Sequence, residues 1–242
     1  MKKISELLKI VCFAMFTLAV ATTLSSCSDD DDDNNNGGGG GNGNIKTCYF
    51  EADGQRWDFD YAFVQYDDYE VTIVFSDIDL MHYFTNPDDV KRGTYFNWVN
   101  LYFEECSDIP TGTVQSSGND VTGEPAFNID METHVDLYAA MNGTYDEEDD
   151  ASLWYTHDWS GDRPSQMQIT KLGDNSYRMD GGSLNLLSSE EHGIGLDSRK
   201  TTGSFMFEGA ITTLYDGRTR SMTVVSDKSF GEWLKKLKGI RK

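Results

Sequence analysis

The sequence predicts an all-β domain, and three observations support this class. Residues 57–63 place large aromatic side chains at every second position, and residues 71–75 repeat the alternation with Val71, Ile73 and Phe75. A period of two is typical of half-buried strands. Similar runs recur between Gly, Asn and Asp turns, and no strand-helix alternation long enough for a parallel sheet interrupts them. We therefore expect an antiparallel fold.

Taken in order, the elements begin with a hairpin at Asp53-Gly54, since both residues tolerate positive φ. Asp67-Asp68 has the composition of the next turn. Later runs with strand character cover residues 95–103, 135–141, 167–172, 183–187, 204–214 and 222–225. About ten short strands favour an antiparallel β-sandwich or jelly roll, and the alternative is a lipocalin-like β-barrel.

The periodicity changes near the C-terminus, where residues 229–238 predict a short amphipathic helix. Ser229 and Glu232 fit a capping box. The apolar residues of this stretch recur at helical spacing, and they are Phe230, Trp233, Leu234 and Leu237. The other face is basic, with Lys235, Lys236 and Lys238. We expect the apolar stripe to pack on the sheet with the lysines toward water or carboxylates, and the alternative is a face that binds lipid or a partner.

Residues 1–26 have the pattern of a secretory signal peptide. Lys2 and Lys3 precede the apolar residues 10–20, and small residues follow at Ser25-Ser26. With the next residue they form Leu24-Ser25-Ser26-Cys27, which resembles the lipobox of bacterial lipoproteins. The resemblance implies that Cys27 is acylated, for example with palmitate, and becomes the mature N-terminus. Two or more acyl chains hold a protein stably on a bilayer.

Residues 27–44 form an acidic and Asn/Gly-rich tether. Five aspartates at residues 29–33 resemble the acidic tract that follows the acylated cysteine in Bacteroidota lipoproteins exported to the outer face of the outer membrane. The remaining residues have nothing apolar to bury, so we expect a disordered spacer with an rms reach of roughly 20–25 Å. The resemblance implies a lipid-anchored protein of the cell outer membrane that faces the exterior.

Residues 45–242 have the size of a single β-rich domain. The whole chain has 20 basic and 41 acidic residues, and residues 1–26 contain three lysines and one glutamate. The mature chain therefore has 17 − 40 = −23 formal charges. Because nucleic-acid affinity comes largely from basic side chains that neutralise phosphates, we expect no nucleic-acid partner.

Once Cys12 and Cys27 are set aside, Cys48 and Cys106 are the remaining cysteines. In an oxidising compartment they form a candidate disulfide, with two buried free thiols as the alternative. Such a bond would stabilise the fold by up to about 4 kcal/mol in the chain-entropy model.

The candidate ligand-binding residues are the aromatic side chains Trp154, Tyr155 and Trp159. They flank a polar loop, and flat rings beside carboxylates suit a sugar ring; the alternative is that these aromatics belong to the core. The sequence has no His-Glu-x-x-His zinc motif and no Gly-x-Ser-x-Gly elbow. We therefore predict no catalytic residue, no metal site and no cofactor.

Several phrases of the domain, including residues 109–113, 169–177 and 207–209, resemble turns and strands of small uncharacterised surface-exposed lipoproteins of the Bacteroidota. The resemblance implies a β-sandwich and a surface location. We favour a non-enzymatic binding or adhesion module, with a glycan or an envelope protein as partner. The alternative is a hydrolase of extracellular polysaccharide that uses paired carboxylates such as Asp58/Asp60 or Asp77/Asp79.

Overall fold

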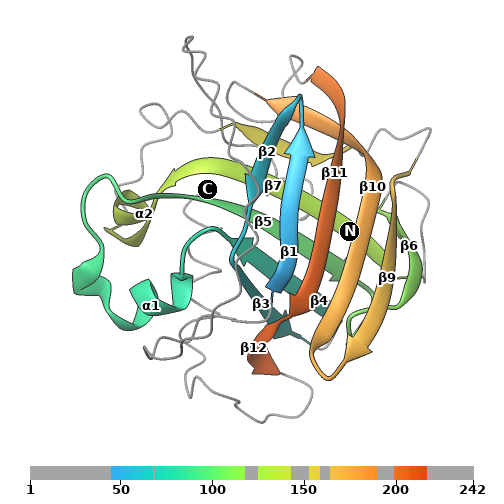
Figure 1. Ribbon diagram of the computed structural model, residues 1–242, viewed down its shortest axis with the longest axis horizontal. Coiled ribbons are helices and arrows are strands. Elements are labelled where there is room, and N and C mark those ends of the chain that lie inside the picture. Colours follow the sequence, from blue (N-terminus) through green and yellow to red (C-terminus); the bar gives the residue numbers. More distant parts are fainter. Residues whose placement is uncertain are drawn as a thin grey trace, which may run out of the picture.

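The computed structural model describes residues 45–67, 69–117, 125–142, 153–158, 164–189 and 199–216. These residues form one large sheet of twelve strands with only short helices (Figure 1), which confirms the β-rich class. The sandwich or jelly roll is not confirmed. The sheet is mixed, because β12 runs parallel to β3 and β6 runs parallel to β7. The strands are β1 (Ile45–Ala52), β2 (Gln55–Asp58), β3 (Tyr61–Tyr66), β4 (Glu70–Ser76), β5 (Tyr95–Glu104), β6 (Gly112–Ser116), β7 (Ala126–Asp136), β8 (Trp154–His157), β9 (Gln166–Gly173), β10 (Ser176–Ser189), β11 (Arg199–Ala210) and β12 (Thr212–Asp216).

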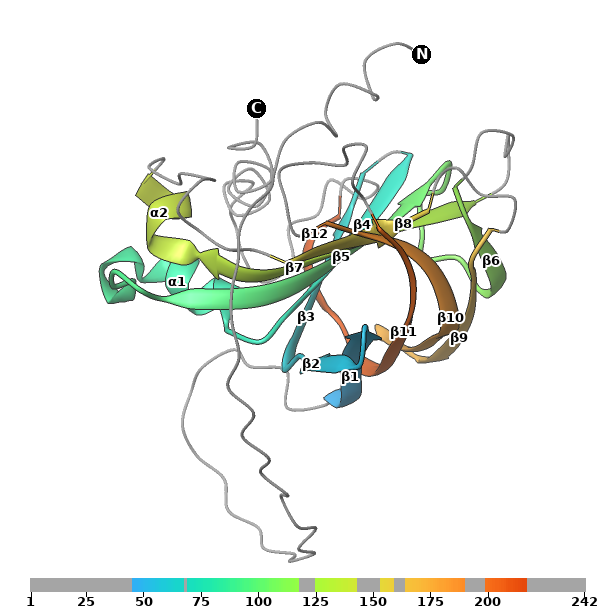
Figure 2. The same ribbon diagram turned by 90° about the horizontal axis from the view of Figure 1, so that it is seen from above.

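The sheet curls, and its ends meet where β2 continues into β3. The strand order is β12-β3-β4-β5-β7-β6-β9-β10-β11-β1-β2, and β8 pairs with β7 and β10. β2 pairs with β1, and the Phe59 amide extends this pairing by donating to the Cys48 carbonyl at 3.0 Å. The next amide, that of Asp60, donates instead to the Ser76 carbonyl of β4 at 3.1 Å. One bent segment thus joins the two ends of the curl (Figure 2).

Alternation along the strands divides the apolar side chains between two clusters. On β5, Val99, Leu101 and Phe103 point into the curl and join the main core, whereas Phe96 and Trp98 point outward. Side chains of α1 (Leu80–Thr85) and α2 (Leu137–Asn142) belong to the outer cluster, and the two helices lie together at one end of β5 and β7 (Figure 2). The predicted strand at residues 135–141 is therefore wrong after residue 136, since α2 begins there.

Two structures lie between β7 and β10: strand β8, and the antiparallel pair of β6 and β9. β8 pairs directly with both β7 and β10. At other residues of these two long strands, β6 pairs with β7, β9 pairs with β10, and β6 and β9 pair with each other. At their junction, short polar side chains replace the missing ladder bonds: the Ser165 amide donates to Ser116 Oγ at 2.9 Å, and the Asn185 amide donates to Ser165 Oγ at 2.7 Å. Buried serines therefore satisfy backbone amides at the point where the strand that pairs with β7 and β10 changes.

Four sequence-based predictions fall outside the described residues: the signal peptide and tether of residues 1–44 with Cys27, the aromatic Trp159, the strand at residues 222–225, and the C-terminal helix at residues 229–238. Within the described part of the chain, no helix combines the length and the apolar character needed to cross a membrane.

Candidate functional site

Strand β8 carries two of the three predicted ligand-binding aromatics and turns them to opposite faces of the sheet. Tyr155 lies opposite Met131 and points into the curl, where it is 1% exposed. Its ring contacts Phe50 and Trp57 at centroid distances of 5.6 and 5.7 Å, and its hydroxyl donates to Asp53 at 3.3 Å. Tyr155 is therefore a core residue and does not lie on the surface, because strand geometry alternates neighbouring side chains.

Trp154 points the other way and lies on the outer face in a half-buried position. Its direct neighbour on β7 is Glu132, whose other neighbour, on β5, is Trp98. Glu132 is only 4% exposed, and the Trp98 indole N–H donates to its Oε2 at 2.6 Å. We call Trp98, Glu132 and Trp154 the tryptophan cluster. It places the Glu132 carboxylate of β7 between two tryptophans on the strands that flank β7.

Polar groups continue along the same face of the three strands. Asp130 follows Glu132 at the next outward position of β7, and it lies between Asn100 of β5 and Thr156 of β8. The Thr156 hydroxyl donates to Asp130 Oδ1 at 2.6 Å. Asn100 is 7% exposed, and its Oδ1 accepts no hydrogen bond within the described part of the chain. Of these polar groups beside the tryptophan cluster, Asp130 is partly exposed, whereas Thr156 and Asn100 are buried.

The far end of this face is acidic. Glu70 of β4 and Glu104 of β5 lie directly opposite each other, and we call them the acidic pair. Burial and then the Glu70 charge raise the pKa of Glu104, which a hydrogen bond from Asn128 partly offsets. The pKa of the neighbouring Tyr102 is also raised, first by burial and then by Glu70 and Asp130. No lysine or arginine of the described residues forms an ion pair with either member of the acidic pair.

His157, the last residue of β8, belongs to the strand junction. It is 1% exposed, and its Nε2 lies 3.1 Å from Ser117 Oγ, which in turn bonds to Asn128 Oδ1. Burial lowers the pKa of His157 to about 4, so the imidazole is neutral at pH 7. This contact was not expected from the sequence, because 40 residues separate Ser117 and His157.

The carboxylate pairs that the sequence suggested for hydrolysis are held by other groups. Asp58 accepts from Arg56 at 2.7 Å. Asp77 accepts from the Asn97 backbone amide at 2.9 Å, and burial is the main cause of its raised pKa. Asp79 caps α1 by accepting from the His82 amide at 2.9 Å. In the ranges that the structure describes, no group of three or more His, Cys, Asp or Glu side chains is arranged to hold a metal ion.

The candidate disulfide between Cys48 and Cys106 is not seen, and both residues are free thiols. Their surroundings differ. Burial raises the pKa of Cys48, and the charges of Asp58 and Asp60 raise it further, whereas burial and then the charges of Asp108 and Glu70 raise the pKa of Cys106. Cys48 lies on β1 and Cys106 follows β5, and these two strands are not neighbours in the sheet.

Sequence reasoning missed Trp98, Asp130 and Glu132. The signal was present, because residues 127–132 alternate Phe, Ile and Met with Asn, Asp and Glu, as a half-buried strand does. What the sequence did not contain was the pairing that brings Trp98 and Trp154 to the two sides of Glu132. Comparisons with protein families, curated protein sequences and solved structures found no match to this chain.

Proposed function

We propose that this protein is an outer-membrane lipoprotein, anchored through Cys27 and facing the cell exterior, and that it binds glycans at the tryptophan cluster. The lipobox-like residues 24–27 and the acidic residues 29–33 support the anchor and the location. The curl supplies a rigid scaffold in which the outer face of β5, β7 and β8 carries the binding groups.

The observation that carries the proposal is the position of Trp154 directly across from Glu132. A sugar presents apolar C–H faces and a rim of hydroxyl groups. The half-buried indole of Trp154 can stack on a C–H face of the sugar, since aromatic side chains combine an apolar face with a polar handle. Asp130 lies at the next outward position of β7, where it is partly exposed, and supplies a carboxylate for the rim. Thr156 is fully buried and holds this carboxylate by donating to its Oδ1 at 2.6 Å.

The test is binding of the full chain to a panel of soluble polysaccharides, measured by affinity gel electrophoresis and tryptophan fluorescence. We expect Trp154→Ala to weaken binding roughly 5- to 150-fold, because loss of one stacking platform removes about 1–3 kcal/mol in comparable ring contacts. Tyr69→Ala is the matched control, since Tyr69 is an exposed aromatic, 77% accessible, in the turn between β3 and β4. Equal affinity of parent and Trp154→Ala for every bound glycan would contradict the proposal.

The same panel tests hydrolysis as the second candidate function. Asp130 and Glu132 share one face of β7, and two residues along a strand separate side chains by about 7 Å, within the spacing of inverting glycosidases. Release of reducing sugar by the parent, and its loss in Asp130→Asn and Glu132→Gln, would replace the binding module with an enzyme. We expect glycan binding without turnover, because Trp98 and Thr156 already hold these carboxylates in fixed hydrogen bonds.

A further inference from the structure

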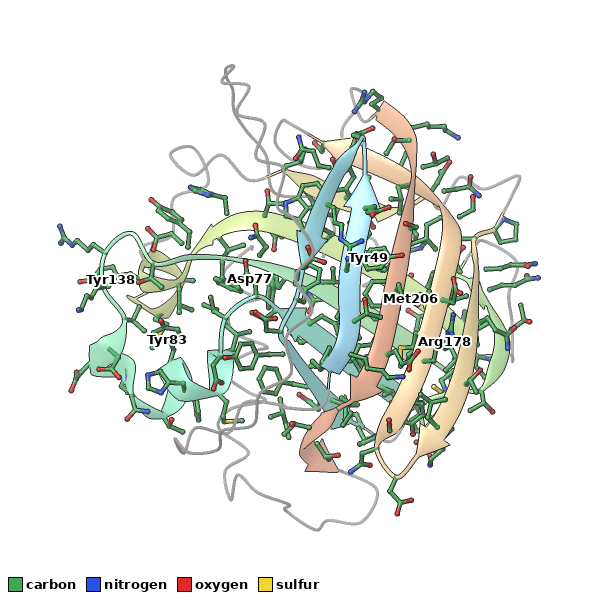
Figure 3. All side chains as sticks on the ribbon, in the orientation of Figure 1. Tyr49, Asp77, Tyr83, Tyr138, Arg178 and Met206 are labelled. Carbon is green, nitrogen blue, oxygen red and sulfur yellow. The ribbon has the colours of Figure 1, made fainter. Side chains whose placement is uncertain are left out.

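The outer face of β12, β3, β4 and β5 combines an apolar part with an acidic part. The apolar part belongs to the outer cluster and contains Phe63, Val74 and Leu214. Half-buried aromatic and methionine side chains from α1 and α2 border it, among them Tyr83 and Tyr138 (Figure 3). The acidic part is the acidic pair, Glu70 and Glu104. We call the two parts together the mixed face.

The apolar and acidic parts lie within the length of one short helix. Val74 and Glu70 point to the same side of β4 because they are four residues apart, a distance of about 13–14 Å along a strand. A helix of ten residues is about 15 Å long. An amphipathic basic helix can therefore contact both parts at once.

This chain contains such a segment after its last described residue. Residues 217–242 have eight lysines and arginines against one aspartate and one glutamate, a formal charge of 8 − 2 = +6 in a protein whose total is −21. The pattern at residues 229–238 predicts a helix with one apolar and one basic face. The segment is thus complementary to the mixed face in both charge and apolar character.

The segment also starts at the right place. The last residue of β12, Asp216, lies opposite Tyr66 of β3, which lies opposite Val71 of β4, and Val71 lies opposite Phe103 of β5. Three strand spacings of about 4.8 Å bring β5 within about 14 Å of the point of departure. The twelve residues from 217 to 228 have an rms reach of roughly 20 Å as a flexible linker. They can deliver the predicted helix to the acidic pair.

We propose that the basic C-terminal segment docks on the mixed face, with its apolar stripe on the outer cluster and its lysines on Glu70 and Glu104. The interaction supplies the positive charges that the acidic pair lacks among the described residues. It also fastens β12, which pairs with β3 alone among the strands of the described residues. The two surfaces share Trp98, which belongs to the outer cluster. The inference nevertheless does not depend on glycan binding, because Glu70 and Glu104 lie on β4 and β5, whereas Glu132 and Trp154 lie on β7 and β8.

The first test is zero-length carbodiimide cross-linking of the full chain in detergent, read by peptide mass spectrometry. We expect links from Lys235, Lys236 or Lys238 to Glu70 or Glu104. The ion pair between Lys46 and Glu208, 2.5 Å apart, is the internal positive control. If the control link forms and no C-terminal lysine links to either glutamate, the proposal is wrong.

The second test is amide hydrogen exchange at residues 229–238. Glu70→Gln with Glu104→Gln should accelerate exchange there at least tenfold, whereas Glu51→Gln, which alters an exposed carboxylate paired with Arg56, should not. Reversed charges should restore protection: Glu70→Lys with Glu104→Lys, combined with Lys235→Glu, Lys236→Glu and Lys238→Glu. Unchanged exchange in the double glutamine variant would overturn the proposal. So would protection that appears only with anionic phosphatidylglycerol vesicles, since this would assign the segment to a membrane surface.

Discussion

Replacing Gly203 with alanine tests the packing of the curl at the seam between β1 and β11. Gly203 lies opposite Ala52 of β1 and Leu184 of β10. A Cβ at this position would lie 2.5 Å from the Glu51 carbonyl oxygen and 2.6 Å from Leu186 Cδ1. Favourable contacts between such atoms are about 3.5–4.0 Å long. The side chain of Leu186 can move, but the carbonyl belongs to the β1 ladder, so the two strands must separate.

The expected effect of Gly203→Ala is a net loss of about 1–2.5 kcal/mol in the free energy of unfolding. Overpacking of a well-packed site typically costs about 1–3 kcal/mol, and a clash with backbone belongs to the upper part of that range. The more restricted unfolded chain offsets about 0.4–1 kcal/mol of it. For a domain of this size, the corresponding fall in Tm is roughly 2–10 °C.

The assay is urea unfolding followed by fluorescence and far-UV circular dichroism, with Gly173→Ala as the matched control. Gly173 ends β9, and a Cβ there would meet no atom within 4 Å. We expect the control to stay within about 0.5 kcal/mol of the parent. A Gly203→Ala variant as stable as Gly173→Ala would show that β1 and β11 are not packed as closely as described.

Three further predictions concern buried groups. Because the pKa of His157 is about 4 in the folded protein against about 6.5 in an unfolded chain, unfolding takes up a proton between these values. The contribution of His157 to the free energy of unfolding should therefore be fully present above pH 6.5 and fall by up to about 3 kcal/mol as the pH drops to 4. His157→Gln should flatten the pH dependence of the free energy of unfolding in urea over that window. An unchanged slope would contradict the burial of the imidazole. Trp98→Phe removes the indole donor to the buried Glu132 carboxylate. It should lower the free energy of unfolding by about 2–3 kcal/mol, measured by thermal unfolding. A loss below about 0.5 kcal/mol, as for ordinary surface substitutions, would exclude that contact. Burial raises the pKa of Cys106 to about 11 and raises that of the more deeply buried Cys48 as well. Iodoacetamide at pH 8 should therefore label Cys106 slowly and Cys48 only after unfolding. A disulfide-linked peptide pair in the mass spectrum would refute the free thiols.

Local features of the fold were predictable from short stretches of sequence. The hairpin at Asp53-Gly54 is present, with φ of 52° and 76° at the two residues. The expected strand at residues 95–103 is β5. Each of these depends on alternation or turn chemistry within a few neighbouring residues, which the sequence displays directly.

The alternation at residues 154 and 155 was equally visible, but the sequence could not show which of the two faces was the core. That depended on the pairing of β8 with β7, which sends Tyr155 toward Met131 and Trp154 toward Glu132. A shift of one residue would exchange their positions.

By itself, the sequence determined the β-rich class, the strand-forming segments and the strong excess of negative charge. Only the tertiary structure decided that the strands form one curled sheet, that Glu132 lies between two tryptophans, and that Glu70 opposes Glu104. The physical reason is that strand propensity acts locally, whereas pairing and register are chosen by burial summed over distant residues; β1 and β11, for example, are joined by an ion pair between residues 162 positions apart.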